Sequence, residues 1–261
     1  MKIVVCIKQV PDTTEVKLDP KTGTLIRDGI PSIMNPDDKG GLEYALQLKD
    51  EYGAEVTVIT MGPPQADAVL REAFAMGADR AILLTSRKFA GADTLATSNA
   101  LAGALKVLDF DLVLAGRQAI DGDTAQVGPQ IAEHLGIPQV SYLEDLKFDG
   151  KKTLRIKKQL EDGYQIVEVD TPCLLTCLAS AVKPRYMSVS GIMDAWNKEV
   201  KIWDTDKIDV AEEKLGLKGS PTKVKKAGAK EMKAAGVVKD GLSAEEAADA
   251  IIEKLKEKFI I

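Results

Sequence analysis

The segment Arg117–Gly128, RQAIDGDTAQVG, concentrates polar and glycine residues that could hold an anionic ligand. It follows Asp111–Ala115, an apolar run too short for a helix, which predicts a buried strand. It leads into Ala125–Leu135, where apolar residues recur at helical spacing. A polar loop that delivers the chain to a helix N-terminus presents unpaired N–H groups and the positive end of the helix dipole, which suits a phosphate. We therefore predict a nucleotide-phosphate site in this loop.

An ordinary strand–helix unit would also explain the loop, because Asp123 or Thr124 could simply cap the helix. Two features favour a phosphate site. The loop is longer than a cap requires, and it gathers several polar side chains, namely Gln118, Asp121, Asp123, Thr124 and Gln126. Since carboxylates repel a phosphate, the two aspartates would have to turn aside, to cap the helix or to reach ribose hydroxyls. Backbone amides with Thr124 and Gln126 would then hold the phosphate, and Arg117 could either add a charge-assisted contact or point to solvent.

Strands and helices alternate regularly around this loop. Strands are predicted at Lys2–Ile7, Glu55–Thr60 and Arg80–Leu84, and helices at Asn35–Lys49, Gln65–Met76 and Asp93–Leu108. The pattern predicts an α/β fold, a doubly wound parallel sheet of the Rossmann-like, adenine-nucleotide-binding type. Ligands of such sheets bind beyond the carboxyl ends of the strands. Three segments would meet there, Cys6–Gln9, Met61–Gly62 and Arg117–Gly128, and their convergence supports a nucleotide site.

The pattern differs in the remaining segments. Lys8–Met34 predicts a long irregular excursion with a short hairpin around Lys21–Gly23. After Ile137, strands are predicted at Val140–Leu143, Thr153–Lys158, Tyr164–Val169 and Pro172–Leu178, with an antiparallel hairpin turn at Glu161–Gly163. We expect an α/β nucleotide- or flavin-binding domain over residues 1–184.

Residues 185–261 are expected to form a partner-docking loop and a C-terminal arm. Lys183–Gly241 shows no sustained periodicity, and Lys218–Lys233 carries six lysines against one acid, as a solvated linker would. Ser243-x-x-Glu246 is a capping-box signal before an amphipathic helix through Lys258. A helix at the end of a long arm has no core of its own to cover, so it must fold back or dock on another chain, and the length of the arm favours docking.

Bulk composition narrows the class of protein. The apolar fraction of 45% and the charged fraction of 29% are those of a globular protein, and the net charge of −5 gives no reason to expect a nucleic-acid partner. Cys6, Cys173 and Cys177 lie in apolar segments, which predicts buried thiols rather than metal ligands. No apolar stretch approaches the roughly 20 residues that cross a bilayer, and no targeting signal precedes the first strand. We expect a cytoplasmic protein without a membrane partner.

Several separated motifs agree, in order, with those of a known family. They are KIVVCIKQV at the start, MNP at Met34–Pro36, AMGADR at Ala75–Arg80, RQAIDGDTAQVG at Arg117–Gly128, IKKQLEDGYQIVEVDTPCLLT at Ile156–Thr176 and PRYMSVSGIM at Pro184–Met193. Over essentially its whole length, the sequence resembles the beta subunit of electron transfer flavoprotein. Agreement between several ordered motifs is far more specific than one glycine-containing loop.

The resemblance implies one half of an alpha–beta heterodimer, in which the alpha subunit binds an FAD and the beta subunit a second nucleotide. Carried over position by position, the contacts to that nucleotide fall at Cys6, Asn35, Pro36, Asp37, Asp38, Met61, Arg117, Gln118, Ala119, Ile120, Asp121, Gly122, Asp123, Thr124, Ala125, Gln126, Val127 and Gly128. The resemblance also implies that the C-terminal arm wraps the alpha subunit. Val189 would be an anchor for docking on an acyl-CoA dehydrogenase.

Two kinds of beta subunit fit this resemblance. Simple members hold AMP as a structural filler. Electron-bifurcating members hold a second FAD, which takes hydride from NADH and splits the pair between ferredoxin or flavodoxin and the alpha FAD. Gly122 and Ala125 leave space and remove charge where simple members carry a bulkier, more acidic run, and Thr13 lacks the aromatic ring that simple members offer to the partner's flavin. These departures favour FAD and bifurcation, with the AMP-holding subunit as the alternative.

Neither kind requires an acid, base or nucleophile from this chain, because the flavin itself accepts the hydride. His134 is the only histidine, and we expect a surface or capping role for it. An ATP-binding module, like certain stress proteins, is a further alternative. ATP-cleaving synthetases would need a Ser/Gly-rich loop after the first strand, which Ile7–Pro11 does not provide.

Overall fold

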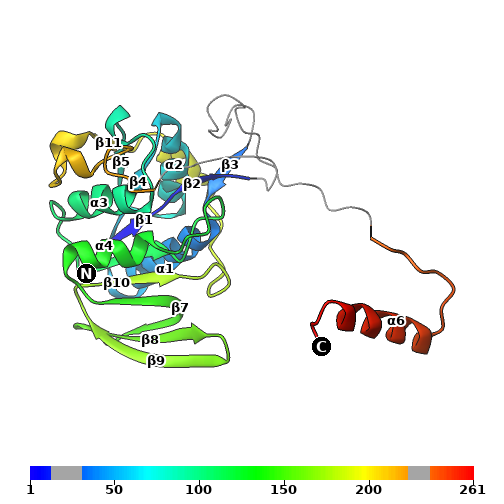
Figure 1. Ribbon diagram of the computed structural model, residues 1–261. Coiled ribbons are helices and arrows are strands. Elements are labelled where there is room, and N and C mark those ends of the chain that lie inside the picture. The colour runs from blue at the N-terminus through cyan, green and yellow to red at the C-terminus, as the bar shows by residue number, and fades with distance from the viewer. Residues whose placement is uncertain (13–30, 223–235) are drawn as a thin grey trace. The chain divides into compact units, whose positions relative to one another are not determined.

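The computed structural model describes residues 1–12, 31–222 and 236–261, which fall into two units, Met1–Ala227 and Gly228–Ile261. The main sheet of the first unit is built from strands β1 (Lys2–Cys6), β4 (Glu55–Met61), β5 (Arg80–Leu84), β6 (Leu112–Gly116), β7 (Gln139–Phe148), β8 (Thr153–Leu160), β9 (Gly163–Asp170), β10 (Cys173–Cys177) and β11 (Val200–Trp203). Among the described residues these nine strands lie in the order β11-β5-β4-β1-β6-β10-β7-β8-β9 (Figure 1). All neighbours pair in parallel except β7–β8 and β8–β9. The pair β8–β9 is the predicted antiparallel hairpin, and the antiparallel pairing of β7 with β8 was not predicted.

Helices cover both faces of the parallel part of the sheet. Helices α1 (Pro36–Tyr52) and α2 (Asp67–Met76) contribute to one apolar core, together with Ile3 and Val5 of β1. Helices α3 (Thr94–Leu105) and α4 (Val127–Leu135) contribute to the other, together with Val4 and Cys6. Because β1 is buried on both faces, its sequence is a continuous apolar run, and the doubly wound α/β fold predicted from that pattern is confirmed.

The winding direction changes at β1. The chain proceeds from β1 outward to β4 and β5, and then returns to place β6 on the other side of β1. The connections after β1 and β6 therefore leave in opposite directions, and a crevice opens between them at the carboxyl ends of the strands.

The long excursion after β1 contains regular structure that its sequence did not predict. Strands β2 (Gln9–Pro11) and β3 (Ser32–Met34) pair antiparallel and form a separate two-stranded sheet. The hairpin predicted around Lys21–Gly23 lies outside the described residues, as does Thr13.

The α/β unit continues beyond the boundary expected near residue 184. Helix α5 (Val189–Ala195) packs on α2, and β11 extends the sheet by pairing in parallel with β5. The expectation that this stretch is irregular is therefore wrong. A helix of seven residues and a strand of four are too short to show a period above the surrounding polar sequence.

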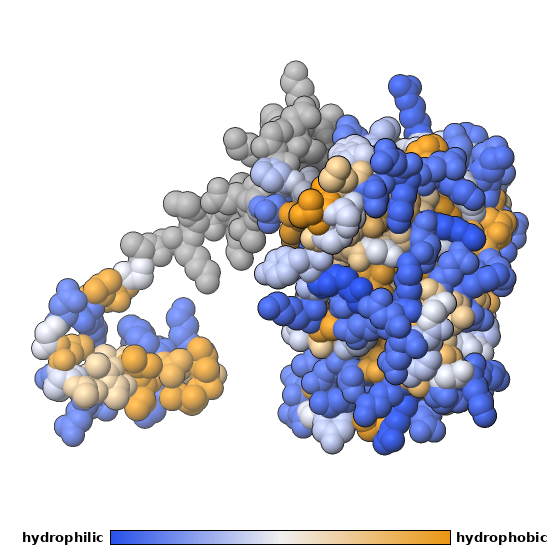
Figure 2. All heavy atoms as spheres, turned by 180° about the vertical axis from the view of Figure 1, so that it is seen from behind, coloured by the Kyte–Doolittle hydropathy of each residue, from blue (hydrophilic) through white to orange (hydrophobic). Residues whose placement is uncertain are grey.

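The described part of the second unit contains helix α6 (Ala244–Glu257). The predicted capping box is present, since Ser243 Oγ accepts from the Glu246 N–H and the Glu246 carboxylate accepts from the Ser243 N–H. Apolar side chains gather along this helix (Figure 2), and none of its residues is buried. Within the described part of the second unit, nothing covers the apolar face of this helix.

An ion pair fastens the segment after β10 to helix α1. Arg185 donates from its backbone N–H and from Nε to Glu43 Oε2, both at 2.9 Å, and the Glu43 side chain is only 6% exposed. Replacing Arg185 by alanine leaves this carboxylate buried without its charged partner. We expect Arg185→Ala to lower the free energy of unfolding by about 2 to 3 kcal/mol, measured by urea denaturation.

Arg80 is the matched control, because its ion pair with Glu55 is formed by an arginine side chain that is 61% exposed. Arg80→Ala should cost less than about 1 kcal/mol. Equal losses from the two variants would show that Arg185 does not fasten this segment.

Candidate functional site

A cavity of about 950 Å³ lies beyond the carboxyl ends of β1, β4, β5 and β6. Its walls include residues from Cys6–Gln9, Met61–Pro64, Thr85–Thr97, Ala115–Ala119 and Gly122–Gly128. The three segments that the sequence predicted to converge do so here. The volume is at the upper end of the range of about 300–1,000 Å³ that is usual for small-molecule sites.

The N-terminus of α4 faces this cavity without a side-chain cap. The helix begins at Val127, and Gln126 occupies the capping position but makes no cap hydrogen bond. The alternative in which Asp123 or Thr124 caps the helix is therefore wrong, as is the predicted helix start at Ala125, whose φ of 53° is not helical. The amides of Val127 and Gly128 are left for an anion, where the helix dipole favours negative charge.

Both aspartates of the loop accept hydrogen bonds from other side chains. Asp121 accepts from Lys8 Nζ at 2.6 Å, and Asp123 accepts from Gln118 Nε2 at 2.8 Å. The sequence predicted that these carboxylates must turn aside, and they do so without capping the helix. Lys8 therefore compensates the charge of Asp121, and Gln118 satisfies Asp123 with a hydrogen bond.

Two loop residues with side chains adopt left-handed backbone conformations. Asp123 has a φ of 49° and Ala125 a φ of 53°. Such conformations cost about 1–3 kcal/mol each and persist only where surrounding contacts impose them. The loop is thus held in a shape that it would not adopt by itself.

Helix α3 also points its N-terminus at the cavity, but that end is already capped. Asp93 accepts from the Ala96 N–H at 3.0 Å, so a carboxylate occupies the position that an anion would take. Thr94 Oγ1 donates to Gln126 Oε1 at 2.8 Å and links the two helix ends. Of the two, only the end of α4 has no side chain that caps it.

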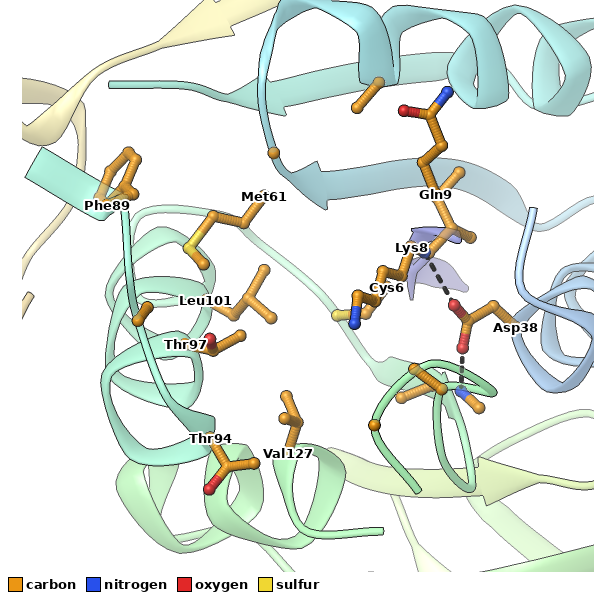
Figure 3. Close-up of a pocket in the computed structure, with 18 of the residues that line it drawn as sticks. Cys6, Lys8, Gln9, Asp38, Met61, Phe89, Thr94, Thr97, Leu101 and Val127 are labelled. Carbon is orange, nitrogen blue, oxygen red and sulfur yellow. Dashed lines mark hydrogen bonds between the residues drawn. The ribbon is translucent and has the colours of Figure 1, made fainter. Parts of the chain in front are cut away.

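Apolar side chains gather on another wall of the cavity. Met61, Phe89 and Leu101 border the cavity there (Figure 3). An apolar wall combined with an anion-binding helix end suits a ligand with a phosphate at one part and a flat, weakly polar ring at another.

A buried carboxylate joins the two strand ends at the switch point. Asp38 Oδ2 accepts from the Lys8 N–H at 2.7 Å, and Oδ1 accepts from the Gly116 N–H at 2.9 Å (Figure 3). Burial raises the pKa of Asp38 from 3.8 to about 7, against the opposing effect of these two N–H groups. Burial also raises the pKa of the neighbouring Cys6 thiol to about 12, which keeps the thiol neutral and unreactive.

The site residues predicted from the resemblance fall into two groups. Those that line the cavity are Cys6, Asp38, Met61, Arg117, Gln118, Ala119, Gly122, Asp123, Thr124, Ala125, Gln126, Val127 and Gly128. Those that do not line it are Asn35, Pro36, Asp37, Ile120 and Asp121. The wall Thr85–Thr97 was not predicted, although its position after a buried strand was a signal that could have found it.

Arg117 lies at the rim of the cavity. Its Nε is 3.4 Å from Asp37 Oδ2, and its guanidinium lies 6.0 Å from the centre of the Tyr142 ring. The arginine is therefore held by a carboxylate and an aromatic face rather than pointing freely into solvent.

Over the described ranges, no group of His, Cys, Asp and Glu could hold a metal ion, and no helix is long and apolar enough to cross a membrane. The three cysteines are free and buried, as predicted. His134 does not line the cavity: its Nε2 lies 3.2 Å from Ser98 Oγ, and burial lowers its pKa.

The fold and the site define a doubly wound α/β protein with a ligand site at its topological switch point. The model of the electron transfer flavoprotein domain matches residues 22–208. Full-length relatives include the electron transfer flavoprotein subunit beta of Clostridium acetobutylicum, 63% identical over 261 residues, and the caffeyl-CoA reductase-Etf complex subunit CarD of Acetobacterium woodii, 56% identical over 263 residues. The acryloyl-CoA reductase electron transfer subunit gamma of Anaerotignum propionicum is 47% identical over 270 residues, and in all three cases 100% of both chains is covered.

The chain therefore belongs to the electron transfer flavoprotein family, as a beta subunit. Beta subunits pair with alpha subunits and act in electron transfer. The family resemblance inferred from the sequence motifs is confirmed.

The close contact between Gly116 and Asp38 provides a test of the site's geometry. A Cβ at this position would collide with Asp38 Oδ1 and lie 2.8 Å from the Asp38 backbone nitrogen, so the strand end and helix α1 would have to separate. We expect Gly116→Ala to cost about 2 to 3 kcal/mol in thermal or urea unfolding, as overpacking does.

Gly122 serves as the matched control, because a Cβ there would meet nothing within 4 Å. Gly122→Ala should leave the unfolding free energy within about 0.5 kcal/mol of the wild-type value. A tolerated Gly116→Ala would contradict the close contact between β6 and α1.

Proposed function

We propose that this chain is the beta subunit of an electron-bifurcating electron transfer flavoprotein and that its cavity holds FAD. The observation that carries the proposal is a single cavity with an uncapped helix end on one wall and apolar side chains on another. The uncapped amides of Val127 and Gly128 fit a pyrophosphate, and Gly122 leaves open space beside it. Met61, Phe89 and Leu101 fit the flat face of a flavin.

FAD would supply hydride acceptance and one-electron donation when bound. The chain's own residues would bind and orient it. The amides at α4 would hold the pyrophosphate, while Lys8 and Gln118 keep the loop carboxylates engaged and away from its charge. The apolar wall would exclude water from the reacting ring. No side chain of the cavity has to act as an acid, base or nucleophile.

In this proposal, NADH would be the hydride donor of the site. The two electrons would be divided between ferredoxin or flavodoxin and, through the FAD of the alpha subunit, an acyl-CoA dehydrogenase. Relatives named for the caffeyl-CoA reductase-Etf complex and for acryloyl-CoA reductase support a partner that acts on acyl-CoA substrates. In this proposal, α6 and the arm before it wrap the alpha subunit, which would cover the apolar face of that helix.

Flavin stoichiometry tests the proposal directly. The chain is co-expressed with its alpha subunit, and the heterodimer is purified, denatured and analysed for released FAD and AMP. We expect two FAD per heterodimer. One FAD with one AMP would replace the proposal by the simple, non-bifurcating alternative.

A variant of the loop tests whether one of the two flavins binds in this cavity. Gly122→Asp introduces bulk and charge beside the loop, so the FAD content should fall from two to one. Gly53→Asp is the control, because Gly53 follows the last turn of α1, does not line the cavity, and a Cβ there meets nothing within 4 Å. Aspartate tolerates the left-handed conformation of this position. Retention of both flavins in Gly122→Asp would contradict the assignment.

The surface around α5 is proposed to dock on the dehydrogenase. Val189 and Met193 of α5, and Trp196 directly after it, are 78%, 68% and 70% exposed, although α5 packs on α2. Arg71 of α2 donates to the Ala195 carbonyl at 2.8 Å and lies 5.7 Å from the centre of the Trp196 ring. An ordered apolar surface of this kind is typical of a protein-binding site.

Val189→Asp should weaken electron transfer to an acyl-CoA dehydrogenase at least tenfold, measured as the dehydrogenase concentration that gives half-maximal rate, because the charge must be desolvated on docking. Reduction of the heterodimer by NADH should be unchanged. The control is Val107→Asp, at another exposed valine of the same unit. An equal effect from both variants would exclude Val189 as a specific anchor.

A further inference from the structure

We propose that Asn35 and Asp37 are positioning residues that hold the first turn of the phosphate loop, Arg117–Ile120, without touching the bound nucleotide. The proposal rests on the nucleotide site proposed above. It assigns to these two side chains a different task from that of the residues that line the cavity.

Asn35 is fully buried and spans the backbone of the loop. Its Nδ2 donates to the Gln118 carbonyl at 2.8 Å, and its Oδ1 accepts from the Ile120 N–H at 3.1 Å. One amide side chain thus satisfies a donor and an acceptor two residues apart. This fixes the orientation of the peptide planes between them.

Asp37 reaches the same turn and a second strand end. Its Oδ2 accepts from the Gln118 N–H at 3.3 Å and lies 3.4 Å from Arg117 Nε, while its Oδ1 accepts from the Ala179 N–H at 2.8 Å. Since Ala179 follows β10, the carboxylate ties the loop after β6 to the neighbouring strand. Together with the bonds of Asp38 described above, the start of α1 holds the chain where it leaves β1, β6 and β10.

The Asn35 side chain bonds to the loop instead of capping its own helix, α1. Asn35 is the N-cap residue of α1, and asparagine is among the best capping residues, yet its side chain makes no cap hydrogen bond. A residue selected only to stabilise α1 would direct its oxygen to the N–H groups of the first turn. Its use on Gln118 and Ile120 indicates that the shape of the loop is what this position maintains.

The loop contains strained residues that must be held in place by surrounding contacts. Beyond Ile120 it passes through the two left-handed residues described above, and the Asp123 N–H donates to the Ala119 carbonyl at 2.9 Å. The strained part therefore starts from the turn that Asn35 and Asp37 hold. If that turn is released, the amides that follow can relax away from the phosphate.

A positioning role through the loop predicts an effect that depends on the ligand's phosphate. A residue that contacts the base or ribose would weaken binding of AMP and adenosine equally. A residue that aims the loop amides would weaken only the ligand that carries the phosphate. AMP is a suitable probe because FAD and AMP share this part of the molecule.

The experiment uses the full-length chain in complex with its alpha subunit, freed of the nucleotide of the beta site, with AMP and adenosine titrated by calorimetry. We expect Asn35→Ala and the isosteric Asp37→Asn each to weaken AMP binding about tenfold and adenosine binding less than twofold. Asn99→Ala is the control, since Asn99 lies on α3 and does not line the cavity. It should leave both affinities unchanged.

Other results would contradict either the positioning role or the nucleotide site. Equal losses for AMP and adenosine, or no loss for AMP in Asp37→Asn, would overturn the positioning role. Should Asn35→Ala fail to fold, the ratio of the two affinities in Asp37→Asn decides. A wild-type complex that binds neither AMP, adenosine nor FAD would instead overturn the nucleotide site itself.

Discussion

The carboxylate of Asp38 is the constraint on which the rest of the site depends. Where a doubly wound sheet changes direction, the chains leaving two adjacent strands diverge and their last N–H groups lose their strand partners. Asp38 accepts from both, at Lys8 and Gly116, and the contact is so close that position 116 tolerates no side chain. Helix α1 is thereby drawn against the strand ends. The loop after β6 then starts from a fixed point and can carry strained conformations further on.

The longer strands and helices of the fold could be predicted from the sequence. Buried parallel strands appear as continuous apolar runs, and the helices between them are longer than two turns. Strand β11 and helix α5 could not be predicted, because each spans only about two repeats of its period, too few to stand out from the surrounding polar sequence. The pair β2–β3 is formed by three-residue strands, whose pairing depends on a contact distant in sequence.

The site was predictable where strand ends specify it. Cys6, Met61 and the loop Arg117–Gly128 follow buried strands and meet at one edge of the sheet. The start of α4 was placed two residues early because the spacing of apolar residues does not mark where a helix begins, whereas Ala125 has a left-handed backbone conformation. The positions of Asn35 and Asp37 came from the family resemblance, and only the structure shows that their side chains face the loop backbone instead of the cavity.

The two helix ends that border the cavity differ in a way that gives the pocket a direction. Asp93 fills the end of α3 with a negative charge, while the end of α4 presents bare amides. A long ligand that is anionic in one part and uncharged in another has a single favourable orientation in a cavity with this difference between its two helix ends. The same polarity that selects the ligand also determines which way round it lies, and hence which of its ends faces the apolar wall.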